Sequence, residues 1–224
     1  MKLRDIVPWG RSQTEYRSMF NLSDADLGGT LLGCGDGPAS FNAEITASGG
    51  RVVSVDPIYR FDATQLRGRI EAAYEEVMPQ VIARPDEYSW KSIRDPDELG
   101  RVRMRAMETF LGDYERGKAQ ERYIEGALPE LPFADERFDL ALCSHFLFLY
   151  SERVSLEQHL ASVRELCRVA KEARIYPLLT LAGEPSPHVD PLRGILNDTG
   201  IDTRLVTVEY EFQKGATQML VARA

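Results

Sequence analysis

The sequence predicts an α/β protein built on a doubly wound, largely parallel sheet. Short apolar runs alternate with amphipathic stretches of helical period, which is the pattern of strand–helix–strand units. The first run, residues 30–32, leads into a glycine-rich segment, and the second run, 51–55, ends at an Asp-Pro pair. Near the end of the chain, two runs are joined by only four residues, which favours an antiparallel hairpin over a further crossover helix.

The elements are expected in the following order. Strands are predicted at residues 30–32, 51–55, 122–125, 138–143 and 174–179, with the terminal hairpin at 203–212 and 217–222. Helices are predicted at residues 39–48, 62–83, 96–118, 154–170 and 189–198. A crossover between parallel strands needs only about a dozen residues, so the long segment 57–121 is predicted to be a helical cap inserted after the second strand.

Composition narrows the class of protein. The 224 residues carry a net charge of −8, and 43% of them are hydrophobic, which fits a single folded domain over 1–224 and argues against a duplex nucleic-acid binder. Three scattered cysteines, Cys34, Cys143 and Cys167, predict reduced, buried thiols. No apolar run reaches the roughly 18 residues of a membrane span, so a cytoplasmic protein without a membrane partner is expected.

The glycine-rich segment has the setting of a ligand-binding loop. Gly33, Gly35 and Gly37 follow a strand and precede a helix, where glycines allow a tight turn and close approach of a ligand to the backbone. Asp56 ends the next strand, a position from which a carboxylate accepts hydrogen bonds from ribose hydroxyls. Pro38 stands where a dinucleotide fingerprint has its third glycine, and Asp36 brings negative charge, so an NAD-dependent oxidoreductase is disfavoured.

These segments resemble the class I S-adenosylmethionine-dependent methyltransferases. Leu-Leu-Gly-Cys-Gly-Asp-Gly-Pro at 31–38 looks like their motif I, and Val-Ser-Val-Asp at 53–56 looks like their acidic second-strand motif. The segment 131–140 resembles the approach to their fourth strand, and the likeness covers residues 28–56 and 122–224. The resemblance implies a Rossmann-like, seven-stranded sheet with a reversed terminal hairpin. It also implies S-adenosylmethionine as cofactor and a small-molecule methyl acceptor.

The resemblance further implies a set of cofactor contacts. The three glycines would line the methionine moiety, and Asp56 would hold the ribose. Ala127 stands where the family often has an acid that binds the adenine amino group, so the backbone near Ala127, or another side chain, would have to hold adenine. The candidate cofactor-binding residues are Gly33, Cys34, Gly35, Gly37, Asp56, Pro57, Ile58, Ala127, Leu128, Ser144 and His145.

His145 is the candidate catalytic residue. It follows the fourth strand, at the edge of the sheet where open α/β folds bind ligands. It could be a general base that deprotonates the acceptor, or a histidine that packs on the cofactor or bonds to the backbone. His159 and His188 have no partners at metal-ligand spacing, so no metal site is predicted.

Two further segments have open roles. The leader, residues 1–28, is either a lid in which Trp9 and Tyr16 form an aromatic wall and Arg11 meets a carboxylate, or a helix that packs on the sheet edge. The cap carries arginines at positions 101, 103 and 105, which form either an anion site or a solvated helix face.

The sequence therefore predicts an S-adenosylmethionine-dependent methyltransferase that acts on a small molecule. A protein that binds the nucleoside without transferring a methyl group remains the alternative, and a homodimer is left open.

Overall fold

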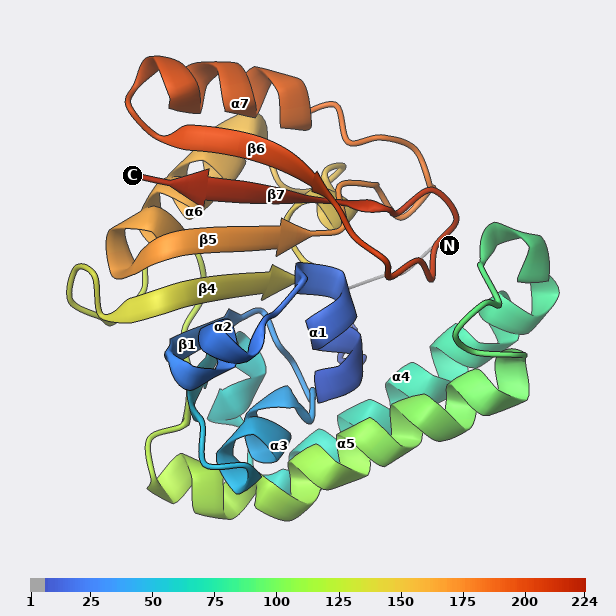
Figure 1. Ribbon diagram of the computed structural model, residues 1–224. Coiled ribbons are helices and arrows are strands. Elements are labelled where there is room, and N and C mark those ends of the chain that lie inside the picture. The colour runs from blue at the N-terminus through green and yellow to red at the C-terminus, as the bar shows by residue number, and fades with distance from the viewer. Residues whose placement is uncertain (1–6) are drawn as a thin grey trace.

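A seven-stranded sheet forms the centre of the molecule, as a computed structural model that describes residues 7–224 shows (Figure 1). Its order is β3-β2-β1-β4-β5-β7-β6, and only β7 runs against its neighbours. The strands are β1 (Thr30–Cys34), β2 (Arg51–Val55), β3 (Tyr123–Ile124), β4 (Phe138–Ser144), β5 (Ala170–Tyr176), β6 (Asp202–Thr207) and β7 (Gln218–Arg223). The predicted doubly wound sheet with a reversed terminal strand is confirmed.

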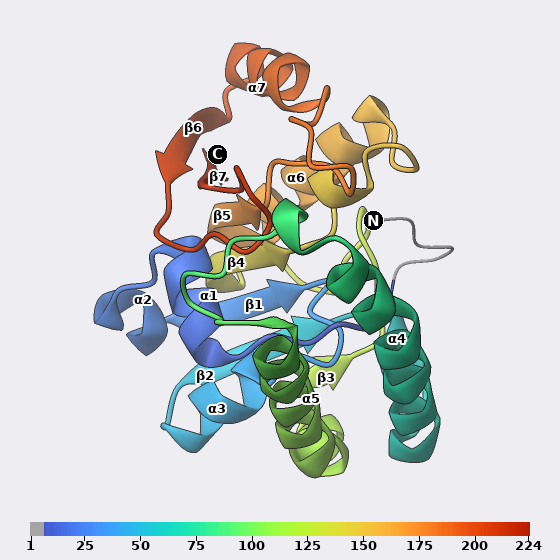
Figure 2. The same ribbon diagram turned by 90° about the vertical axis from the view of Figure 1, so that its right-hand side faces the viewer.

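Helices cover both faces of the sheet because its central strands are apolar on both sides (Figures 1 and 2). Leu31 packs into one core and Leu32 into the other, since successive strand residues point to opposite faces. One face carries α1 (Gln13–Phe20) and α3 (Phe41–Ala47), and the other carries α6 (Leu156–Val169) and α7 (Val189–Asp198). A short helix, α2 (Asp24–Gly28), leads into β1. All three cysteines are free and buried, as expected.

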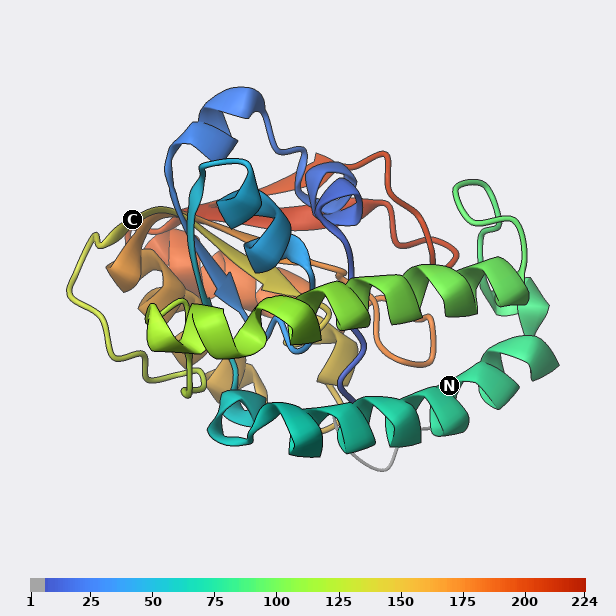
Figure 3. The same cartoon turned by 90° about the horizontal axis from the view of Figure 1, so that it is seen from below.

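The predicted helical insertion forms an antiparallel pair of long helices, which we call the arm (Figure 3). It comprises the turn η1 (Pro57–Arg60), α4 (Ala63–Ala83), the turn η2 (Pro85–Glu87) and α5 (Pro96–Ala119). The base of the arm has its own aromatic core of Tyr59, Phe110, Tyr114 and Tyr123, whose ring centroids lie 5.1–6.0 Å apart. Within residues 7–224, no helix combines the length and the apolar character that crossing a membrane requires.

Two strand predictions are wrong in their bounds. The fifth strand covers Ala170–Tyr176 rather than 174–179, and the charged residues Glu172 and Arg174, which pair with each other, lie within it. The sixth strand ends at Thr207, so the four-residue link is also wrong. Residues 208–217, which we call the closing loop, lie outside the sheet, although 208–212 keep the alternation of a strand.

The closing loop packs on the tip of the arm. The amide of Ser89 donates to the carbonyl of Phe212 at 2.7 Å, and the amide of Lys214 donates to the carbonyl of Glu87 at 3.1 Å. The rings of Tyr88 and Phe212 stack with centroids 4.9 Å apart. These contacts join two segments that are far apart in the sequence.

A buried ion pair ties the leader to both of these segments. Glu15 lies in the first turn of α1, and both of its oxygens accept from Nη1 of Arg103 in α5, at 2.6 and 2.7 Å. The hydroxyl of Tyr210 in the closing loop donates to the same carboxylate at 2.9 Å. Arg103 is fully buried, so a solvated face describes Arg101 and Arg105 but is wrong for Arg103.

Replacing Glu15 with Gln is expected to lower the free energy of unfolding by about 3–5 kcal/mol, because it leaves buried guanidinium charge without its counter-ion. Glutamine is also suited to the N3 position of the capping box that Glu15 occupies. The variant therefore removes the negative charge while it keeps the helix cap. Glu108→Gln is the control, since it breaks an exposed pair with Arg67 and should cost about 0–1 kcal/mol. Urea unfolding measures both, and equal losses would contradict the role given to Glu15.

Candidate functional site

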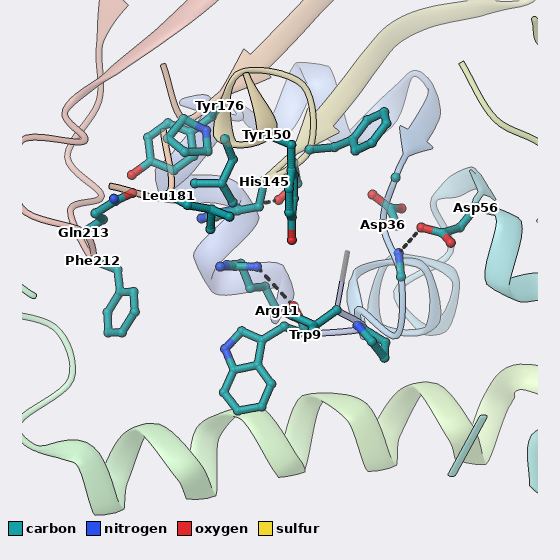
Figure 4. A pocket seen from close by; sticks show the side chains of 18 of the residues that line it. Trp9, Arg11, Asp36, Asp56, His145, Tyr150, Tyr176, Leu181, Phe212 and Gln213 are labelled. Carbon is teal, nitrogen blue, oxygen red and sulfur yellow. Dashed lines mark hydrogen bonds between the residues drawn. The ribbon is translucent and has the colours of Figure 1, made fainter. Parts of the chain in front are cut away.

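A cavity of about 520 Å³ opens at the carboxyl ends of the central strands, beneath the leader, the arm and the closing loop (Figure 4). This is the edge of the sheet at which open α/β folds bind ligands. Residues 34–37, 55–58, 126–128 and 144–146 line what we call the glycine-loop side. A second part of the lining, which we call the apolar side, consists of Trp9, Val77, Val81, Tyr88, Leu149, Tyr150, Leu181 and Phe212, and the polar residues Glu87, Gln213 and Lys214 line the cavity next to Tyr88 and Phe212.

The glycine-rich loop turns immediately after β1. Gly35 and Gly37 adopt positive φ values of 69° and 54°, which side chains rarely tolerate. A Cβ added to Gly35 would lie 3.2 Å from Cβ of Phe146, so the absence of a side chain keeps the loop open toward the cavity. Gly33 does not line the cavity. A Cβ at Gly33 would overlap the carboxylate of Asp36, so this glycine makes room for that side chain.

Asp36 lies almost fully buried beside the loop. Its carboxylate accepts hydrogen bonds from the hydroxyls of Tyr16 and Ser54, both at 2.7 Å. Burial raises the pKa of Asp36 to about 6, although these two hydrogen bonds act in the opposite direction. Tyr16 therefore does more than the aromatic packing expected of it, because it joins the leader to the floor of the cavity.

Asp56 occupies the carboxyl end of β2, as its position before a proline predicts. Its two oxygens accept from the amides of Ile58 and Gly37, each at 2.9 Å, which fixes the carboxylate against the glycine loop. Burial raises the pKa of Asp56 to about 6, against the effect of these amides. Each oxygen can still accept a hydrogen bond from a hydroxyl group. Pro57 and Ile58 line the cavity next to it.

His145 follows β4 with a φ of 53°, an unusual conformation for a residue with a side chain. Its amide donates to the carbonyl of Tyr176 at 2.6 Å, and its Nδ1 lies 2.9 Å from Oγ of Ser144. Burial, followed by the charges of Arg11 and Arg103, lowers the pKa of His145 well below its ordinary value. The imidazole is therefore neutral near pH 7 and a weak base.

The stretch 126–128 lines the cavity near the end of β2. Ala127 is exposed and contributes only backbone atoms and a methyl group, and its carbonyl accepts from the amide of Glu130 at 3.2 Å. The position thus lacks a carboxylate, as the sequence indicates.

Arg11 and Trp9 bring the leader into the cavity. Nη1 of Arg11 donates to the carbonyl of Trp9 at 3.1 Å, and the Trp9 ring lies 6.0 Å from that of Tyr74 in α4. Arg11 is only 9% exposed, and its Nε has no hydrogen-bond partner among the described residues.

The cavity brings together the candidate residues except Gly33. Sequence reasoning missed most of the apolar side, including Tyr88 and Phe212, because these side chains meet only through the contact between arm and closing loop.

Comparison with known proteins found no matching family model. An uncharacterized protein of Methanocaldococcus jannaschii, MJ0045, is 31% identical over 224 residues, covering 100% of this chain and 98% of that protein. Among solved structures, WbdD is 12% identical with a TM-score of 0.50, over 94% of this chain and 40% of WbdD. Magnesium protoporphyrin IX methyltransferase (ChlM) from Synechocystis PCC 6803, solved with bound SAM, is 15% identical with a TM-score of 0.44, over 89% of this chain and 72% of that chain.

The strand order, with its single reversed strand, is that of the Rossmann-like methyltransferase fold. With this fold, and with similarity along its whole length, the chain belongs to the same family as the M. jannaschii protein.

Proposed function

We propose that the protein is an S-adenosylmethionine-dependent methyltransferase that acts on a small molecule. The observation that carries the proposal is the carboxylate of Asp56, held at the end of β2 by the amides of Ile58 and Gly37. A carboxylate fixed there, beside a glycine loop, suits the two ribose hydroxyls of a nucleoside.

Charge favours this cofactor over a dinucleotide. Asp36 and Asp56 both line the glycine-loop side, and no arginine or lysine is among the residues that line that side. A sulfonium and an ammonium group complement carboxylates, whereas a pyrophosphate would be repelled by them. Gly35 and Gly37 would contact the methionine moiety, and Pro57 and Ile58 would contact adenine.

The transfer itself asks little of the protein beyond positioning. When bound, S-adenosylmethionine would supply an activated methyl group, which would form a bond to the acceptor nucleophile as its bond to sulfur breaks, leaving neutral S-adenosylhomocysteine. Holding acceptor, carbon and sulfur in line and excluding water then lowers the barrier. We propose that neutral His145 orients the acceptor or cofactor, since its low pKa makes it a poor general base.

The leader and the arm would act as the cap over this reaction. Trp9 and Arg11 of the leader line the cavity together with Val77 and Val81 of the arm, which supports the proposal. Residues 1–6, which belong to the predicted 1–28 lid, lie outside the described residues.

Asp56→Ala is expected to weaken binding of S-adenosylhomocysteine by about 1.5–3 kcal/mol, the scale of hydrogen bonds to a charged group. Calorimetry measures the affinity, with NADH as the comparison ligand that the wild type should not bind. Transfer of a labelled methyl group to candidate acceptors then separates an enzyme from a binding protein. Absence of S-adenosylhomocysteine binding by the wild type would overturn the proposed function.

Gly35→Val is expected to abolish cofactor binding, because the branched side chain would meet Phe146 and strain a backbone at positive φ. Gly49→Val is the matched control. It imposes the same kind of strain at a φ of 83°, but its Cβ would meet open space and it does not line the cavity. Calorimetric binding should remain normal in the control, and normal binding in Gly35→Val would show that the loop is only a turn.

Affinity for S-adenosylhomocysteine should fall on acidification. Donor hydroxyls and cationic groups favour the ionised carboxylates, and burial raises the pKa of both Asp36 and Asp56 to about 6. Protonation below that pH opposes binding, so affinity should drop about tenfold or more between about pH 7.5 and about pH 5. Titrations across this range measure the slope, which Asp56→Asn should reduce. A flat profile in the wild type would remove both acids from the cofactor site.

A further inference from the structure

Arg11 is a buried positive charge beside the cavity, and it has no counter-ion among the described residues. Arg11, Glu15 and Arg103 form a buried cluster of two guanidinium groups and one carboxylate. Both oxygens of Glu15 are engaged by Arg103, whereas no carboxylate of residues 7–224 lies within ion-pair distance of Arg11. Among residues 7–224 the cluster holds one more positive than negative charge, and burying such a charge is costly, so this position favours an anionic group.

Arg11 lines the cavity, and the described part of the chain leaves its guanidinium incompletely hydrogen-bonded. Within residues 7–224, its Nη1 donates only to the carbonyl of Trp9, and its Nε is buried without a partner. In Figure 4 it lies between Trp9 and His145, with Asp36 and Asp56 on one side of the view and Phe212 on the other. Arg11 thus stands where the glycine-loop side meets the apolar side.

The apolar side has the chemistry of a site for a flat organic molecule. Aromatic rings of Trp9, Tyr88, Tyr150 and Phe212 line it, with aliphatic side chains from α4 and from the loop after β5. Such walls stabilise a bound ligand by removing its apolar surface from water and by stacking on its rings. Small-molecule sites combine walls of this kind with a few placed polar groups that fix orientation.

We propose that the apolar side binds a methyl acceptor with a flat apolar body and a carboxylate, and that Arg11 binds that carboxylate. This inference rests on the proposed function and names its substrate class. The planar guanidinium, which lines the cavity, matches a carboxylate in geometry, and its buried Nε is a donor that residues 7–224 leave unpaired. The acceptor's apolar body would then extend from Arg11 toward Phe212 and away from Asp36.

The test uses two probes that differ in charge. Naphthalene-2-carboxylate and naphthalene-2-methanol are titrated by calorimetry into the protein loaded with S-adenosylhomocysteine. The carboxylate should bind about 10–100-fold more tightly than the alcohol, the range of a charge-assisted hydrogen bond. Similar affinities for the two probes, or binding of neither, would overturn the proposal even if Arg11 variants failed to fold.

Variants of Arg11 test whether this side chain causes the preference for the carboxylate probe over the alcohol probe. Arg11→Gln should lose about 10–100-fold in affinity for the carboxylate and leave the alcohol nearly unchanged, and Arg11→Lys should retain part of the preference. Arg105→Gln is the matched control, since Arg105 is exposed on α5 and does not line the cavity. Unchanged discrimination in Arg11→Gln would overturn the assignment.

The carboxylate that binds Arg11 could also be that of the methionine moiety of the cofactor. A second experiment distinguishes the two sources. S-adenosylhomocysteine and 5′-methylthioadenosine, which lacks the amino-acid end, are titrated into wild type and Arg11→Gln. If Arg11→Gln lowers the affinities for the two nucleosides by factors that agree within about threefold, the result supports an acceptor carboxylate as the partner of Arg11. A loss of about tenfold or more confined to S-adenosylhomocysteine gives Arg11 to the cofactor and overturns the proposal. If the wild type binds neither nucleoside, the proposed function fails, and the naphthalene probes on the unloaded protein still decide the role of Arg11.

Discussion

The ion pair between Glu15 and Arg103 is the contact on which the cavity depends. It joins the leader to the arm, and the hydroxyl of Tyr210 adds the closing loop to the same carboxylate. None of these three segments is a strand of the sheet, although α1 and α5 pack against it. Their shared carboxylate links the three segments to one another in a buried setting, where a charge without a partner is strongly unfavourable.

The same burial sets the electrostatics of the site. Although desolvation opposes ionisation, the charges of Arg103 and Arg11 hold the pKa of Glu15 below its usual value, while burial raises the pKa of Asp36 and of Asp56. The difference arises because neither Asp36 nor Asp56 has a cationic partner among residues 7–224. Acids that are buried with only neutral donors suit a ligand that brings its own positive charge.

Local patterns in the sequence predicted the sheet and the glycine-loop side well. Strand and helix periods placed β2 and α7 at their observed bounds, and the position of Asp56 after a strand put it at the correct edge. Long-range contacts were not visible in this way. The run 208–212 alternates like a strand because its apolar residues pack on the arm and leader, and Arg103 looks like its solvated neighbours until α1 presents Glu15. Both errors arise where tertiary partners override a local pattern.

The contact between the closing loop and the arm also orders events during synthesis. Chains emerge from the ribosome with the N-terminus first, so Glu15 and Arg103 are available long before Tyr210 and Phe212. Until those residues emerge, the tip of the arm lacks the ring that stacks on Tyr88, and the carboxylate of Glu15 lacks one donor. Because Phe212 lines the apolar side, a nascent chain that ends before residue 212 cannot present both sides of the cavity to a ligand.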